Sequence, residues 1–191
     1  MNKLANLLLS ILIVAYPFLI FFSLDRLPLN AIVTCLFALF ILRLLFVFRA
    51  KKQINYLKYF ALLSAILGCV LSLFALVSQS ENSLLFYPVI MNIIAFVIFG
   101  FSLLYPPSII ELFARLVNKN LPDQAINYTR NVTITWCIFF IINGSIAFIT
   151  VLSNDLSLWT WYNGLISYIL MGILFIIEFC IRQYVKRKLT H

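Results

Sequence analysis

The segment Tyr128–Phe140, YTRNVTITWCIFF, passes from polar to apolar within a few helical turns. Its first half carries Arg130 and hydroxyl side chains, and its second half carries Trp136 among aliphatic and aromatic residues. No charged residue follows until Asp155. A bilayer hydrocarbon core of about 30 Å needs about 20 apolar residues in a helix. The segment therefore predicts the point at which a helix enters a membrane.

The composition of the whole chain agrees with this prediction. The 191 residues are 64% hydrophobic and only 10% charged, whereas soluble domains have a charged fraction of about 25%. A soluble fold could not bury this much apolar surface, so lipid must be the solvent for most of it. The net charge is +8, but the basic residues flank apolar runs, which indicates contact with lipid headgroups and not with nucleic acid.

The apolar runs predict an all-α membrane helix bundle that forms one domain over residues 1–191. Strands of a membrane barrel would alternate apolar and polar residues, whereas helices satisfy their own backbone hydrogen bonds in lipid. The six expected spans lie near residues 4–24, 30–48, 58–78, 84–105, 132–152 and 159–181. The first run is too long for a signal peptide and has no small-residue cleavage pattern before Asp25, so we expect a retained helix.

Lysine and arginine residues predict the orientation of the six spans. One set of termini and loops carries twelve of them, and the opposite set carries only Arg26. Loops that remain in the cytoplasm are enriched in these residues. We therefore expect both termini in the cytoplasm.

A seventh, interfacial helix is expected at residues 107–119. One predicted face is apolar and carries Ile109, Ile110, Phe113, Leu116 and Val117. The opposite face carries Glu111, Arg115, Asn118 and Lys119, and its first two residues are spaced to form an ion pair. This pattern is typical of a helix in the plane of the membrane surface. It serves either as a plain connector or as a surface for a cytoplasmic partner or a lipid headgroup.

Small residues recur in the third predicted span at Ser64, Gly68 and Ser72. Such a stripe lets two helices approach closely in lipid. We expect this contact within the bundle, with homodimerisation as the alternative, and the oligomeric state stays open.

Residues that could hold a metal ion or a cofactor are scarce. The four cysteines lie in predicted spans without a C-x-x-C pair, and His191 is the single histidine. The six acidic residues are scattered. We therefore expect no metal, no cofactor and no catalytic residue, and we interpret the protein as a non-enzyme.

Two charges, Arg43 and Glu178, fall inside predicted spans. Charges at such positions are rare and often functional, although Arg43 can also extend its side chain to the interface. Glu178 can pair with Arg182 on its own helix or with Arg43 across the bundle. The alternative to a structural pair is a polar pocket for a ligand or a proton.

Several polar or aromatic residues are expected near the cytoplasmic side. They are Arg43, Arg115, Tyr128, Arg130, Thr133, Trp136, Glu178 and Arg182. The guanidinium groups among them are suited to bind a phosphate or carboxylate headgroup. A set of membrane anchors without a ligand is the alternative.

Residues 105–185 carry a set of short motifs: Leu121-Pro122, Tyr128-Thr129-Arg130, Val132-Thr133, Trp136, Phe139-Phe140, and Glu178 with Arg182. In these motifs the segment resembles an uncharacterised family of bacterial multi-pass inner-membrane proteins. Members are often encoded beside acyl carrier protein, ketosynthase and acyltransferase genes of aryl-polyene or fatty-acid-like pathways. The resemblance implies an inner-membrane location and cytoplasmic acyl-chain enzymes as partners. A weaker likeness is to the intracellular septation protein A family, which implies a role in envelope maintenance or septation.

Three functions follow as hypotheses. The first is a non-enzymatic accessory or scaffold protein in cell-envelope lipid or polyene biogenesis. The second is a transporter or flippase of a lipid-like acyl product, with a polar cavity lined by Arg43, Glu178 and Asn143 or Asn163. The third, a membrane acyltransferase, requires a catalytic constellation that the sequence does not display.

Overall fold

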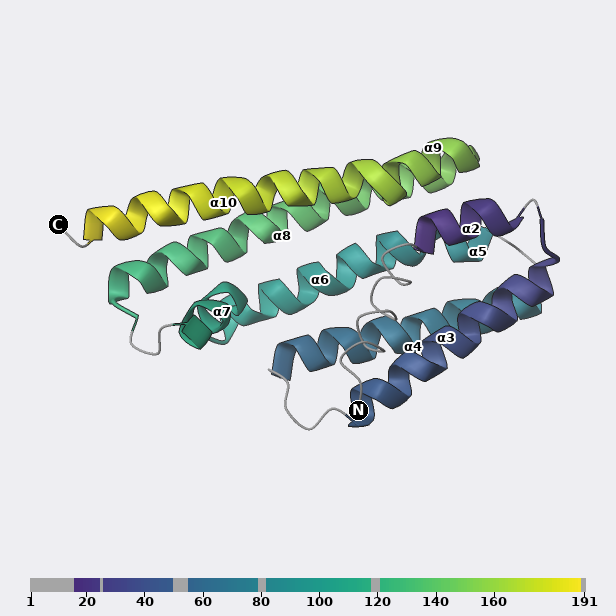
Figure 1. Cartoon of the computed structure of the whole chain (residues 1–191), viewed down its shortest axis with the longest axis horizontal. Coiled ribbons are helices and arrows are strands. Elements are labelled where there is room, and N and C mark those ends of the chain that lie inside the picture. Colours follow the sequence, from purple (N-terminus) through teal and green to yellow (C-terminus); the bar gives the residue numbers. More distant parts are fainter. Residues whose placement is uncertain (1–15, 25, 50–54, 79–81, 118–120, 190–191) are drawn as a thin grey trace.

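The computed structural model of the chain describes residues 16–24, 26–49, 55–78, 82–117 and 121–189. Within these ranges the regular structure is entirely helical (Figure 1). The helices are α2 (Tyr16–Leu24), α3 (Leu29–Arg49), α4 (Asn55–Ser78), α5 (Asn82–Leu85), α6 (Tyr87–Leu104), α7 (Ile109–Val117), α8 (Asp123–Leu152), α9 (Leu156–Trp161), the π-helix η1 (Tyr162–Ile166) and α10 (Ser167–Leu189). The expected all-α class is confirmed.

Five stretches of the described chain are long and apolar enough to span a membrane. They are Leu29–Phe48, Ala61–Ser78, Ser83–Leu104, Asp123–Leu152 and Leu156–Gln183. Each overlaps one of the expected spans, and the protein is therefore a membrane protein. Of the first expected span, 4–24, only α2 lies within the described residues, so the total of six spans stays a prediction.

Helix α8 is longer than the span expected at residues 132–152. It begins at Asp123, directly after Pro122 in an extended conformation. Its 30 residues extend about 45 Å at 1.5 Å per residue, well beyond a hydrocarbon core of about 30 Å. Hydropathy marks only the part of a helix that lies in lipid, so the polar first turns were not counted in the expected span.

The bundle has α6 at its centre. Helix α6 packs against α8 on one side and α4 on the other, and α3 packs along α4 (Figure 1). The largest fully buried side chains include Ile20, Phe40, Leu84 and Trp159. The stripe of small residues on α4 is buried within this bundle, and a Cβ atom added at Gly68 would overlap the Phe40 ring. The stripe therefore serves the packing of α4 on α3.

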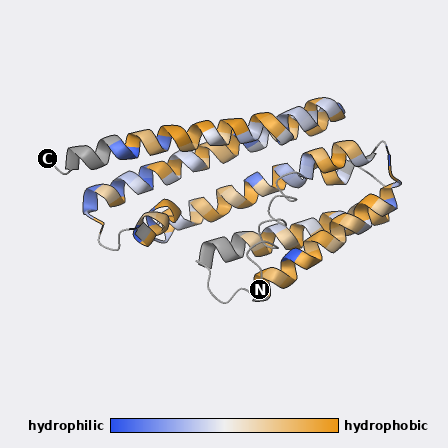
Figure 2. Cartoon of the chain, in the orientation of Figure 1, coloured by the Kyte–Doolittle hydropathy of each residue, from blue (hydrophilic) through white to orange (hydrophobic). Residues whose placement is uncertain are grey.

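One end of the bundle collects the basic helix termini. There the C-terminal ends of α3 and α10 lie with α7 and the N-terminal end of α8, while α9 and the N-terminal end of α3 lie at the opposite end (Figure 1). We call the end that contains α7 the basic end. The elements that meet there carry Arg49, Arg115, Arg130 and Arg182. The apolar stretches of the helices lie between the two ends (Figure 2).

Helix α7 differs from the interfacial helix expected at residues 107–119. It covers Ile109–Val117, residues 118–120 lie outside the described ranges, and it packs against α8. Glu111, expected on the water-facing side, is only 5% exposed, whereas Leu116 of the apolar face is 67% exposed, as a side chain that faces lipid would be. The expected position was wrong for Glu111, because a periodic pattern separates two faces without showing which residues meet a neighbouring helix.

Candidate functional site

A cavity of about 350 Å³ lies beside α6, between the α2, α3 and α4 side of the bundle and the α8, η1 and α10 side. Its polar lining consists of Tyr16, Arg43, Ser64, Tyr87, Asn92, Asn143, Asn163, Ser167 and Tyr168. Its apolar lining consists of Pro17, Pro88, Met91, Ala95, Phe140 and Met171. Polar groups at this position in a membrane helix bundle are costly and are usually functional.

Three side chains from three elements form a hydrogen-bonded chain that includes Asn143 and Asn92 of the cavity lining, and we call it the amide relay. The Tyr162 hydroxyl donates to Asn143 Oδ1 at 3.0 Å, and Asn143 Nδ2 donates to Asn92 Oδ1 at 3.0 Å. Asn92 Nδ2 then donates to the backbone oxygen of Pro88 at 2.8 Å. Each group satisfies the next, so the relay joins η1, α8 and α6 through polar contacts inside lipid.

The π-helix η1 places Asn163 at the cavity. Its wider turn interrupts the run from α9 to α10, and such single π-turns are frequent at functional sites. Asn163 Nδ2 donates to Thr150 Oγ1 at 3.1 Å and to the backbone oxygen of Trp159 at 2.9 Å. Gly164 lets α2 approach closely, since a Cβ atom there would lie 2.9 Å from the Phe18 ring.

The opposite wall carries a buried phenol and the one formal charge among the described residues of the cavity lining. Arg43 reaches the cavity from α3 and Tyr87 from the start of α6. The Tyr87 ring lies 4.6 Å from that of Tyr16 and 5.4 Å from that of Phe40, between ring centroids. Tyr16 donates its hydroxyl to the backbone oxygen of Leu84 at 2.9 Å. The Tyr87 hydroxyl is buried and has no hydrogen-bond partner among the described residues.

Glu178 lies away from the lining of this cavity. Its Oε1 pairs with Arg182 Nε at 3.5 Å, and its backbone oxygen accepts a hydrogen bond from the Tyr128 hydroxyl at 3.2 Å. Of the two partners considered for Glu178 from the sequence, the structure shows Arg182. The three residues join α8 to α10 towards the basic end.

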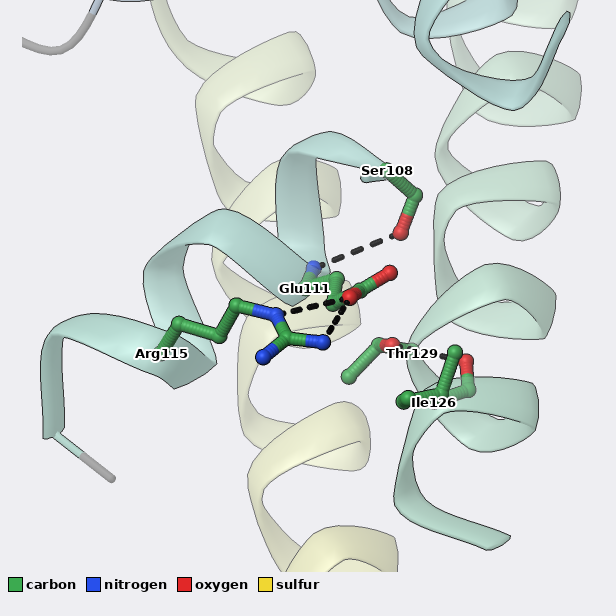
Figure 3. A network of polar contacts seen from close by, with 5 residues as sticks. All are labelled: Ser108, Glu111, Arg115, Ile126 and Thr129. Atoms are coloured by element: carbon green, nitrogen blue, oxygen red, sulfur yellow. Dashed lines mark hydrogen bonds and ion pairs between the residues drawn. The ribbon is translucent and has the colours of Figure 1, made fainter. Parts of the chain in front are cut away.

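The remaining arginines of the expected cluster are not among the described residues that line the cavity with Arg43. Arg115 donates from Nε and Nη2 to Glu111 Oε1, at 2.8 and 2.7 Å, beside Thr129 of α8 (Figure 3). Arg130 lies exposed on α8. These charges lie on different helices of the bundle, and the sequence could not show which of these helices are neighbours.

Thr133 and Trp136 belong to the packed interior. Thr133 is fully buried and donates its hydroxyl to the backbone oxygen of Thr129 at 2.9 Å. The Trp136 ring lies 4.6 Å from Phe175, 5.8 Å from Phe140 and 6.4 Å from Phe99. These contacts join α6, α8 and α10, so both residues position the helices that carry the cavity.

The structure adds Tyr87, Asn92 and Ser167 to the candidate site, and the sequence did not single these residues out as site residues. Asn92 carried the clearest signal, because a lone amide in an apolar span is costly unless it is bonded. Within the described ranges, no three His, Cys, Asp or Glu side chains are grouped so as to hold a metal ion. The cavity instead offers hydroxyl, amide and guanidinium groups, which bind ligands through hydrogen bonds and charge.

Comparison of the chain with protein-family models, with curated proteins and with solved structures found no match. The family resemblance described above therefore stays a prediction.

Proposed function

We propose that the protein is a transporter or flippase that binds a lipid-like acyl molecule in the cavity beside α6. The observation that supports the proposal is a hollow within the spans whose lining is both polar and apolar. Ligand sites commonly have volumes of about 300–1,000 Å³ and combine apolar walls with a few placed polar groups. An amphipathic molecule matches such a lining better than a fully polar or fully apolar one.

The proposal includes an orientation in a bacterial inner membrane with both termini in the cytoplasm. It is supported by the excess of lysine and arginine on the basic end over the opposite end. The family resemblance supports an acyl or polyene product of envelope biosynthesis as the cargo.

The accessory or scaffold role, with cytoplasmic acyl-chain enzymes as partners, also stays a prediction. It depends on the polar face of α7 reaching a partner protein. Glu111 of that face is buried and bonded to Arg115, which leaves less of the face for a partner. The cavity is the more specific observation, and for this reason we favour binding and transport.

Native mass spectrometry of the protein, released gently from its own membranes, tests the proposal. We expect one acyl or polyene lipid per chain in the wild type. Ala95→Leu extends a side chain of the cavity lining and should reduce the bound fraction at least about tenfold. Gly100→Leu is the matched control on the same helix, because a Cβ atom at Gly100 meets nothing within 4 Å.

The control variant should retain the lipid as the wild type does. A wild-type protein without bound amphiphile, or equal retention in a folded Ala95→Leu variant, would reject the proposed function. Circular dichroism and gel filtration verify that each variant is folded.

A further inference from the structure

We propose that the molecule bound in the cavity carries an anionic head, a carboxylate or a phosphate, and that Arg43 and Tyr87 bind this head. The inference rests on the proposed function, since it names the class of ligand for the same cavity. It is carried by the different chemistry of the two cavity walls.

The first step is the charge of the lining. Of the described residues that line the cavity, Arg43 is the one cationic side chain and none is acidic. A guanidinium has five N–H donors in a planar fork, so it can bind ligand oxygens in addition to contacts within the protein. Carboxylates and phosphates accept such bonds in pairs. The cavity potential therefore favours an anion.

The second step is the Tyr87 hydroxyl. Tyr87 is 5% exposed, lines the same cavity, and its hydroxyl lacks a hydrogen-bond partner among the described residues. Buried hydroxyl groups are normally bonded, because an unmade hydrogen bond in a water-excluded site is costly. A ligand oxygen in the cavity would accept this O–H. Tyr87 thus supplies a second donor to the head that Arg43 attracts.

The third step is that the amides of the opposite wall are already engaged. Asn143 accepts from Tyr162 and donates to Asn92, and the amide nitrogen of Asn163 donates to two protein oxygens. Fewer hydrogen-bond donors of this wall therefore remain available to a charged head. Met91, Phe140 and Met171 supply apolar lining for the rest of the ligand. The head therefore lies on the α3 and α6 side, with the acyl chain along these apolar residues.

Binding of three amphiphiles with the same chain tests the inference on the full-length protein in phosphatidylcholine nanodiscs. The probes are dodecyl phosphate, dodecyltrimethylammonium and the neutral 1-dodecylglycerol, each measured by calorimetry against empty nanodiscs. We expect dodecyl phosphate to bind about tenfold to a hundredfold more tightly than either other probe, as for a charge-assisted hydrogen bond.

The variants separate the charge from the fold. Arg43→Gln should remove the preference for dodecyl phosphate, Arg43→Lys should keep part of it, and Tyr87→Phe should weaken dodecyl phosphate by about fivefold to tenfold. Arg130→Gln is the matched control, since Arg130 is an exposed arginine outside the cavity, and it should bind as the wild type does. If Arg43→Gln does not fold, Arg43→Lys and Tyr87→Phe still test the head site.

The outcomes distinguish this inference from the proposed function. Equal binding of all three probes, or a preference that folded Arg43 and Tyr87 variants retain, would overturn the anionic head while leaving an amphiphile site. Absence of binding by every probe would overturn both. Displacement of dodecyl phosphate by phosphatidylglycerol in the nanodisc would identify a lipid headgroup as the source of the anion, and its failure to displace would identify a single-chain anion.

Discussion

Asn143 lies at the centre of the polar interior and bonds to two other elements of the bundle. Replacing Asn143 with Leu removes its bonds to Tyr162 and Asn92 and leaves both partners in a water-poor interior. We expect a loss of about 1–3 kcal/mol in the free energy of unfolding, measured by titration with sodium dodecyl sulfate. Ser145→Leu, at an exposed position of the same helix, should cost much less. An equal cost for both variants would exclude the amide relay as a stabilising contact.

Gly68 allows the close approach of α4 to α3. In Gly68→Ala the added methyl group meets the Phe40 ring, so we expect a destabilisation of about 1–3 kcal/mol, as in other overpacked cores. Gly172→Ala adds the same methyl group where nothing lies within 4 Å, and it should leave the protein unchanged or slightly more stable. Thermal unfolding in detergent compares the two. A Gly68→Ala variant as stable as Gly172→Ala would contradict the observed α3–α4 packing.

The sequence predicted cavity residues where a polar side chain interrupts an apolar run, because such side chains are seldom placed in lipid. Arg43, Asn143 and Asn163 stood out as polar side chains in apolar runs, and all three line the cavity. Tyr87 did not stand out, because a tyrosine near the end of a span also suits the membrane interface. Its role depends on which helices are neighbours, and a single sequence does not contain that information.

At the scale of elements, α7 packs against α8 and carries a buried carboxylate, Glu111, that pairs with Arg115 of the same helix. Glu111→Ala leaves Arg115 without this acceptor and opens a gap beside α8, so we expect α7 to detach more often. The readout is the rate of maleimide labelling at Ile109→Cys, a buried position, with the four native cysteines replaced by Ala. The rate should rise at least about tenfold.

Labelling at Leu116→Cys, which is exposed in α7, is the control for this measurement and should be fast with either residue at position 111. If labelling at position 109 stays slow after Glu111→Ala, then the Glu111 side chain does not contribute to the packing of α7 on α8.

The sequence predicted the ends of a helix well where hydropathy changes sharply from one residue to the next. The spans that begin near Leu29 and end near Leu104 and Leu152 agree with the apolar runs. The π-helix η1 has no periodic signal, because its sequence, YNGLI, is too short to show a period that differs from that of an α-helix. Hydropathy did not predict the start of α8 at Asp123, because the first turns of this helix are polar. Helices also form from polar residues outside lipid.

At the scale of the whole molecule, the proposed orientation follows from the charge difference between the two ends. A reporter fused after His191 should be active in the cytoplasm, and one inserted after Asn154, at the turn between α8 and α9, should be active on the opposite side of the membrane. Paired alkaline phosphatase and green fluorescent protein fusions give opposite signals at the two sites. The reverse pattern would invert the orientation, and equal signals would exclude the two-ended arrangement of the bundle.

The central claim is that the cavity beside α6 binds an amphiphile in the folded protein. The most direct test is protection of Ser167→Cys, a cavity residue on α10, from a small water-soluble methanethiosulfonate reagent, with the four native cysteines replaced by Ala. We expect labelling in phosphatidylcholine nanodiscs and at least about tenfold slower labelling with saturating dodecyl phosphate, while labelling of the control Asn127→Cys, at an exposed position in the polar first turns of α8, is unaffected by the amphiphile. Labelling of Ser167→Cys that dodecyl phosphate does not slow would contradict the claim.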